Sequence, residues 1–278
     1  MLFFDLILLS KAKEGEKNKT EYGFYAATLA CALIVVSYLM LVQAFLNNDF
    51  GLVEVYSYSS SGLPATSKIY ATWSGASTSM LFLTFLIAMS YFIYRFRTYN
   101  KGTATNIAAY KLFNVVVIFF IFLTFMNSPF QRLPITPNDG GGLNPLLQTF
   151  WMFAHPPVVF AGYVLIILAF VLTLARMTTH ENGNSRSMKL LLQAAWLTTT
   201  LGIAVGGLWA YEVLGWGGYW GWDAVETASL LPWLALTAYF HLGTLSKAGK
   251  SLTRELMLLV TFASVIFATA LTRGGLLK

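Results

Sequence analysis

The sequence predicts an all-α, polytopic integral membrane protein with about seven transmembrane helices. Hydrophobic residues make up 56% of its 278 residues and charged residues 11%. A soluble domain of this size carries roughly a quarter of its residues as charges, so lipid is expected to be the main solvent. The charges also fall in short runs between long apolar segments, which is the pattern of membrane helices joined by loops.

Seven apolar stretches are predicted to cross the membrane. A bilayer core takes about 20 helical residues. Lipid offers no partner for an unpaired backbone group, so each crossing segment should be a helix. The stretches are approximately Tyr22–Phe45, Trp73–Tyr94, Ala109–Phe125, Pro157–Ala175, Leu190–Trp209, Val225–Leu245 and Glu255–Thr272.

The basic residues predict the orientation of these helices, because positively charged loops stay on the cytoplasmic side. All but four of the 18 Lys and Arg residues precede the first stretch or follow the second, fourth or sixth. The exceptions are Lys68, Arg132, Arg273 and Lys278. The N-terminus is therefore expected in the cytoplasm and the C-terminus outside, with the longer loops on the outer face of the plasma membrane.

The chain is expected to form a single membrane domain, residues 1–278, without internal repeats. Residues 1–20 have an apolar decapeptide before a lysine-rich run. A signal peptide has the opposite order, so we expect a cytoplasmic or interfacial segment. The lone Cys31 excludes an internal disulfide and a C-x-x-C redox pair. The net charge of +6 is assigned to membrane orientation, and no nucleic-acid partner is expected.

The most unusual segment is a tryptophan-rich loop, residues 216–223, before the sixth stretch. Five of the eight tryptophans lie between Trp209 and Trp233. One interpretation is an aromatic belt at the membrane interface. The other is a platform for a flat ligand, because glycines between the rings permit close approach and aromatic faces supply rigid contact area. Composition leaves both open.

The end of this loop predicts a helix start. Asp223 is suited to be an N-cap residue, and Glu226 three residues later completes a capping box. This structural role is compatible with a ligand role for the preceding rings.

The three histidines differ in their surroundings. His155 precedes Pro156-Pro157, a pair typical of a helix start, so we place it at the outer end of the fourth span. It is either a haem-iron ligand or an interfacial histidine bonded to the backbone. His241 lies in the sixth span, where an ionisable residue suggests a function, although snorkelling near the helix end is an alternative. His180 is interpreted as a solvated loop residue.

Several strings resemble a known family. The loop matches the W-G-x-x-W-x-W-D signature of the haem-handling proteins of cytochrome c maturation, which include CcmC, CcsA and CcmF. Over residues 60–278 the flanking strings resemble the N-terminal half of CcmF, with Gly274 where that family has serine. They are Asn144-Pro145-Leu146-Leu147-Gln148, His155-Pro156-Pro157, Trp209-Ala210-Tyr211-Glu212, Asp223-Ala224-Val225-Glu226, Leu231-Pro232-Trp233 and Leu271-Thr272-Arg273-Gly274-Gly275-Leu276.

The resemblance implies a haem lyase, or holocytochrome c synthase, subunit. Its loop would receive substrate haem from the chaperone CcmE and promote thioether bonds to apocytochrome c. His155 matches the first of two outer-face histidines, and His241 the first ligand of a separate, redox-active haem b. Haem contacts are expected from Trp209, Trp216, Gly217, Tyr219, Trp220, Trp222, Asp223 and Glu226. Arg132 and Arg273 either pair with haem propionates or mark a loop and a helix end.

The sequence also departs from the family, since it ends at Lys278 before the second histidine of either pair. We therefore expect a second CcmF-like chain to supply them; truncation and an orphan half with altered chemistry are the alternatives. Two other functions are weighed. A CcmC-like haem carrier without catalysis fits less well, because the Asn144–Gln148 and His155–Pro157 strings resemble CcmF. An unrelated transporter would need broken helices or paired mid-membrane charges.

Overall fold

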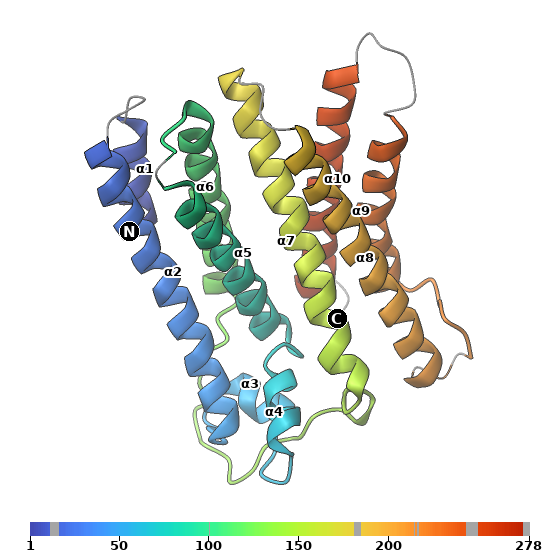
Figure 1. The fold of residues 1–278 in the computed structure, drawn as a ribbon. Helices are drawn as coiled ribbons and strands as arrows, with labels where there is room; N and C mark the ends of the chain where they lie inside the picture. The colour runs from blue at the N-terminus through green and yellow to red at the C-terminus, as the bar shows by residue number, and fades with distance from the viewer. Residues whose placement is uncertain are drawn as a thin grey trace. The chain divides into compact units, whose positions relative to one another are not determined.

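The computed structural model describes residues 1–11, 17–99, 101–180, 185–213, 215, 217–242 and 250–274. This part of the chain is built from helices (Figure 1), and its only bridge between extended segments joins Leu52 and Arg132. The helices are α1 (Leu2–Ser10), α2 (Lys17–Leu46), α3 (Val53–Tyr58), α4 (Ala65–Ala71), α5 (Ala76–Thr98), α6 (Ala104–Met126), the 3-10 turn η1 (Pro145–Leu147), α7 (Phe150–Thr179), α8 (Ser185–Val213), α9 (Ala224–His241) and α10 (Lys250–Arg273).

The predicted all-α membrane fold is confirmed. Within the described residues, six helices are long and apolar enough to cross a membrane, namely α2, α5, α6, α7, α8 and α10. The seventh expected stretch is helical too, as α9, but it is not among these six. It has 18 residues and includes Glu226, Pro232 and His241, which reduce its apolar character. The orientation of the termini stays a prediction.

The start of α7 differs from the prediction. The helix begins at Phe150 and continues through Pro156 and Pro157, which were expected to open it. A proline removes only the bond from its own nitrogen to the carbonyl four residues earlier. Those carbonyls belong to Met152 and Phe153 in the first turn, so most of the helix ladder is unaffected. His155 consequently lies inside α7.

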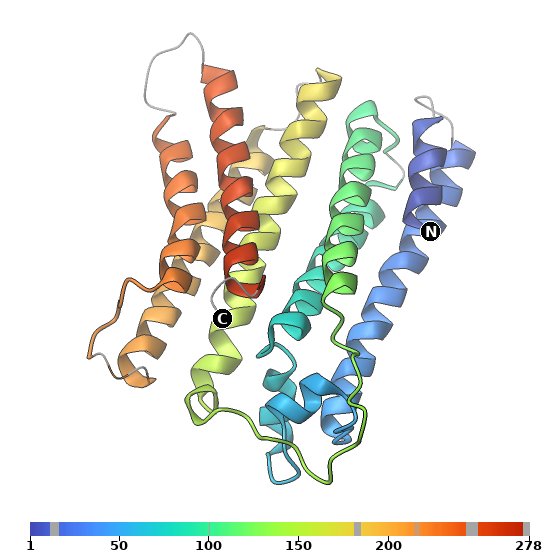
Figure 2. The same cartoon turned by 180° about the vertical axis from the view of Figure 1, so that it is seen from behind.

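The helices group into two compact units. The first contains Met1–Asn144 and Leu174–Gly183, and the second contains Pro145–Thr173 and Asn184–Lys278. In the first unit, α2, α5 and α6 lie beside one another, with α1 at one end of α2 and α3 and α4 at the other (Figures 1 and 2). The single membrane domain expected from the sequence stays a prediction.

A buried polar cluster attaches α1 to the first unit. The Asp5 side chain is completely buried, and Arg95 of α5 pairs with it, with Nη2 and Oδ1 2.9 Å apart. Asn114 of α6 donates to the same carboxylate at 2.7 Å, and the hydroxyl of Tyr91 donates at 3.3 Å. Buried charges need such partners. Residues 2–10 are therefore a packed helix.

At the opposite end of this unit, the loop after α6 folds back onto α3 and α4. The amide and hydroxyl of Ser61 each donate to Asp139 at 2.7 Å. Backbone bonds join Val53 to Gln131 at 2.9 Å and Leu133 to Gly51 at 2.8 Å. These contacts give the long loop a fixed path even though it has no regular secondary structure.

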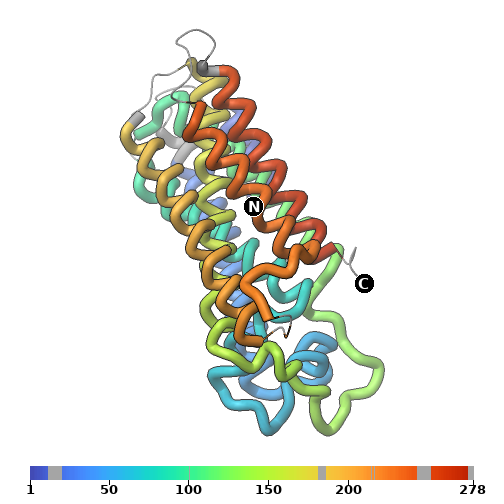
Figure 3. The backbone as a smooth tube through the Cα atoms, turned by 90° about the vertical axis from the view of Figure 1, so that its right-hand side faces the viewer, coloured from blue at the N-terminus to red at the C-terminus, as the bar shows by residue number. Residues whose placement is uncertain are grey.

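Small residues and tryptophans pack the second unit. Thr199 lies against Gly162, where an added Cβ would be 2.7 Å from the Thr199 side chain. Val159 lies against Gly202, where an added Cβ would be 2.9 Å from the Val159 side chain. Two bonds of 2.8 Å join α8 to α9, from Trp196 to Thr237 and from Trp233 to Thr200. Such small-residue contacts and interhelical bonds are typical of membrane helix pairs. Figure 3 shows α9 and α10 running side by side in opposite directions.

Candidate functional site

His155 is held against α8 by two glycines of that helix. Its Nδ1 lies 3.0 Å from the carbonyl oxygen of Gly202. A carbonyl can only accept, so Nδ1 must carry the proton and donate, which leaves Nε2 as the ring's lone-pair nitrogen. Gly206 leaves space for the ring, since a Cβ there would lie 2.7 Å from the His155 Cε1. The imidazole therefore has a fixed tautomer suited to binding a metal ion.

An aromatic side chain of α8 lies beside this histidine. The ring of Trp209 on α8 is centred 5.7 Å from the His155 ring. Two residues later, Tyr211 stacks on Tyr219 of the loop with centroids 4.5 Å apart and an interplanar angle of 13°. Gly207 permits this approach, since a Cβ there would meet the Tyr219 carbonyl oxygen at 3.1 Å. The described part of the tryptophan-rich loop thus folds back onto the end of α8 at Gly207 and Tyr211.

The backbone of this loop has an unusual conformation. Gly217 has a φ of +69°, which favours glycine. Trp222 has a φ of +55°, which a bulky side chain rarely adopts. Such local strain clusters at functional sites. Trp216 lies outside the described residues, so the prediction for its side chain is not addressed by the geometry.

The predicted helix cap is present. Asp223 is the N-cap of α9, and its carboxylate accepts from the Glu226 amide at 2.6 Å. Glu226 also folds back, but its carboxylate accepts from the Gly221 amide at 2.8 Å, two residues before the expected capping-box partner. Both carboxylates therefore fix the end of the loop.

Aromatic faces and unpaired donors remain available on this site. The side chains of Tyr219 and Trp222 are 57% and 72% exposed. The indole Nε1 of Trp220 is buried and has no hydrogen-bond partner among the described residues, and the same holds for Nε of Arg273. The Arg273 guanidinium lies over the Phe160 ring at 4.8 Å. The site could accept a flat apolar ligand with anionic groups.

The structure does not bring every predicted site residue together. Arg132 belongs to the first unit, where its guanidinium lies 3.3 Å from Asp49. His241 ends α9, about 27 Å along the helix from its Asp223 cap, and its Nδ1 lies 2.8 Å from the Thr237 carbonyl oxygen. Among the described residues, no three His, Cys, Asp or Glu side chains form a metal-binding cluster.

Two features of the site were not singled out from the sequence. The Trp151 indole donates to Glu212, which ties the start of α7 to the end of α8. Gly202 and Gly206 form a G-x-x-x-G pattern, and this spacing predicts close helix packing. The pattern could have identified the face of α8 that receives His155, but not which residue of α7 lies there.

The fold and the site define a class of protein: a multi-pass α-helical membrane protein with an aromatic loop and a histidine on a helix as its candidate ligand site. Within that class, the chain belongs to the cytochrome c assembly protein family, whose sequence profile matches residues 73–276. The predicted resemblance to CcmF is confirmed by similarity to individual proteins.

Three similar proteins illustrate the relationship. The cytochrome c-type biogenesis protein NrfE of Haemophilus influenzae is 36% identical over 260 residues, covering 91% of this chain and 40% of NrfE. CcmF of Escherichia coli is 36% identical over 249 residues, covering 87% and 38%. A solved structure, the cytochrome c haem lyase CcmF, matches with a TM-score of 0.80 at 25% identity over 99% of this chain and 45% of that chain. The chain thus spans about two fifths of the length of these curated relatives.

Proposed function

We propose that this chain forms the haem-receiving part of a haem lyase, at the outer face of the plasma membrane. One observation carries the proposal: His155 is fixed with Nδ1 on a backbone carbonyl and its ring beside Trp209 of α8. A hydrogen bond from the other ring nitrogen to a carbonyl orients a metal-ligating histidine and increases its basicity. In the proposed complex, His155 binds haem iron through Nε2.

Residues of the tryptophan-rich loop and of α10 have the chemistry to contact a haem. The exposed rings of Tyr219 and Trp222 offer faces for the macrocycle. Trp220 Nε1 and Arg273 Nε are buried donors without partners among the described residues, and propionate carboxylates would satisfy them. Arg132 is paired with Asp49 in the first unit, so the structural support for a propionate contact is stronger for Arg273.

The proposed chemistry needs positioning more than acid–base groups. A bound haem supplies the vinyl groups, and each cysteine S–H of apocytochrome c adds across one vinyl C=C bond. Sulfur bonds to one carbon, the proton ends on the other, and no oxidant is consumed. The loop and His155 would hold the macrocycle while the thiols approach, and such orientation lowers the barrier. We assign no catalytic residue.

A second haem, of b type, is proposed at His241. The side chain is exposed at the end of α9, and its Nδ1 lies against the Thr237 carbonyl oxygen, as in the arrangement at His155. Coordination by two histidines would require a further histidine beyond these 278 residues, on the same or a second CcmF-like polypeptide. Delivery of substrate haem by CcmE completes the proposed set of partners.

Haem titration of single variants tests the proposal. Purified chain, alone and with a co-expressed CcmF-like partner, is titrated with haem and followed by absorbance. His155→Ala should remove the outer-loop haem and leave the b-type signal, and His241→Ala should do the reverse. His180→Ala is the matched control. Equal haem binding by all three variants would show that neither histidine is a ligand.

A separate assay distinguishes a lyase from a haem carrier. Cells that depend on this chain are scored for covalent haem in cytochrome c. A lyase component predicts that His155→Ala abolishes covalent attachment while haem-loaded CcmE accumulates. If attachment is lost while CcmE stays empty, the chain acts instead in haem loading.

A further inference from the structure

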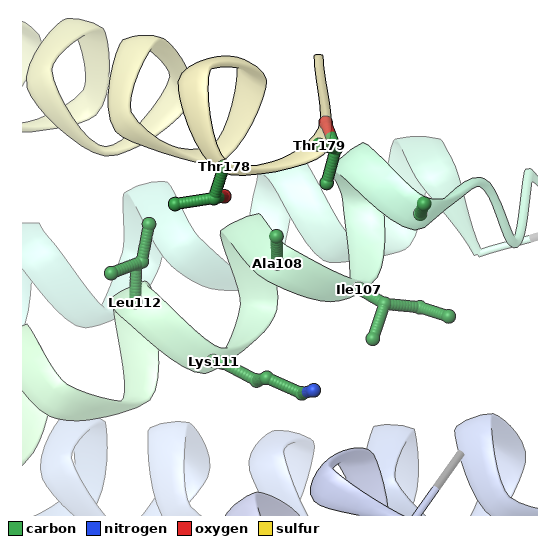
Figure 4. Close-up of a pocket in the computed structure, with 7 residues that line it drawn as sticks. Ile107, Ala108, Lys111, Leu112, Thr178 and Thr179 are labelled. Carbon is green, nitrogen blue, oxygen red and sulfur yellow. The ribbon is translucent and has the colours of Figure 1, made fainter. Parts of the chain in front are cut away.

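A pocket in the first unit is lined by residues other than those of the proposed haem sites. It has a volume of about 450 Å³ and lies between the start of α6 and the last turn of α7. Its walls include Ile107, Ala108, Lys111, Leu112, Thr178 and Thr179, which Figure 4 shows as sticks. Its volume falls within the range of small-molecule sites.

The surface of this pocket is mainly apolar, although two of its lining residues are threonines. The Thr178 hydroxyl donates to the Ala175 carbonyl at 2.9 Å. The Thr179 hydroxyl bonds to the same carbonyl at 3.0 Å and to Thr105 at 2.8 Å. Both hydroxyls are therefore used within the protein, and a ligand would meet mainly hydrocarbon here.

Lys111 is the one charged residue among these walls. It lies about 10 Å along α6 from Ala104, at 1.5 Å per residue, and so within a candidate membrane span. No ion pair of Lys111 is found among the described residues. An ionisable side chain inside a span suggests a functional site. Figure 4 shows Ala108 and Leu112 turned toward Thr178, while the Lys111 side chain leaves α6 on the side away from Thr178.

An apolar stripe continues from Lys111 along α6. Val115, Phe119 and Phe122 follow at helical spacing, and their side chains are 56%, 41% and 56% exposed. Residues spaced by three and four positions lie on one face of a helix. The helix thus carries the positive charge of Lys111 at one end of this exposed apolar stripe.

We propose that this pocket binds one anionic phospholipid. The phosphate pairs with the Lys111 ammonium at the edge of the pocket. One acyl chain begins between Ala108, Leu112 and the Thr178 methyl group and continues along the stripe at Val115. Basic residues near the membrane surface attract anionic lipids, and the long lysine stem lets the charge reach the headgroup level.

Photo-crosslinking tests the site on the purified full chain. The probe is phosphatidylglycerol with a photoreactive group in one acyl chain, and labelled peptides are mapped by mass spectrometry. We expect label on residues 104–115 and 178–179. Unlabelled phosphatidylglycerol should compete, whereas phosphatidylcholine and inorganic phosphate should not.

Two lysine variants decide the role of the charge. Lys111→Gln should weaken competition by phosphatidylglycerol roughly fivefold, as expected for one lost lysine near a membrane surface. Lys101→Gln, an exposed lysine just before α6, should leave it unchanged. Equal competition by phosphatidylcholine would show non-selective annular lipid, and competition by phosphate alone would show a small-anion site. Either result, or unchanged competition by phosphatidylglycerol in Lys111→Gln, would overturn the proposal.

Discussion

The orientation of the His155 ring depends on two glycines, which have no side-chain functional groups. Gly202 contributes a carbonyl oxygen and Gly206 contributes space. The sequence identified His155 as a candidate ligand, but not these two partners. Contact between two helices is a tertiary property, and a helical repeat alone does not say which turn of α8 meets α7.

Gly206→Ala should weaken haem binding at the proposed outer site. The added methyl group would lie 2.7 Å from His155 Cε1, so the ring must move away from its Gly202 partner. Disturbing a hydrogen bond that orients a metal-ligating histidine typically reduces metal affinity roughly 10- to 100-fold. Absorbance titration measures the change, and Gly62→Ala, where a Cβ meets nothing within 4 Å, is the control. Unchanged affinity would argue against His155 as the ligand.

Asp223→Ala should destabilise α9. Loss of an N-cap side chain costs about 1 kcal/mol, which thermal unfolding of the purified protein would detect. Asp223→Asn should stay within a few tenths of a kcal/mol, because asparagine caps helices equally well. If asparagine were as harmful as alanine, the negative charge of Asp223 would matter more than the cap. This cap was predictable because its signal lies within four consecutive residues.

Among the helices, α1 shows how one charged residue, Asp5, determines where a helix packs. The apolar sequence of residues 1–10 suggested a surface segment, yet Asp5 is buried with Arg95, Tyr91 and Asn114. Its partners lie 86 to 109 positions away in the chain. No local pattern reports a contact over such a separation.

A double-mutant cycle on Asp5 and Arg95 tests this packing. Removing one member of a buried ion pair leaves the other charge uncompensated and costs roughly 3–5 kcal/mol. Asp5→Asn and Arg95→Gln should each destabilise the protein and reduce hydrogen-exchange protection of α1. The double variant should be less harmful than the sum of the two. Simple additivity would mean that the pair contributes no coupling.

The loop between α6 and α7 should loosen in acid where Asp139 holds it to Ser61. Hydrogen bonds from the amide and hydroxyl of Ser61 and the amide of Gly140 lower the pKa of Asp139. A depressed carboxylate pKa stabilises the folded loop above the unfolded value of about 3.9, and this contribution is lost as the pH falls through the folded pKa. Exchange protection of the Ser61 amide, corrected for intrinsic rates, should therefore fall below about pH 4. Asp139→Asn should show weaker protection without this pH dependence.

At the scale of the whole molecule, the distribution of basic residues predicts which ends of the helices face the cytoplasm. Cysteine labelling in a Cys31→Ser background tests this directly. Asn138→Cys, in the loop after α6, should react with a membrane-impermeant thiol reagent added outside intact cells. Ser187→Cys, at the start of α8, should react only after the cells are opened. The reverse pattern would invert the proposed location of the haem loop.

The sequence by itself determined the class of fold, the family and the residues of the tryptophan-rich loop. Hydropathy, charge and the Asp223 cap are local signals, and the family motif is a string of neighbouring residues. Only the tertiary structure decided that α7 continues through Pro156 and Pro157, that Asp5 is buried, and that two glycines hold His155. These features depend on contacts between residues that are distant in the sequence. The packing of α7 against α8 at Gly202 and Gly206 fixes the position of the His155 ring.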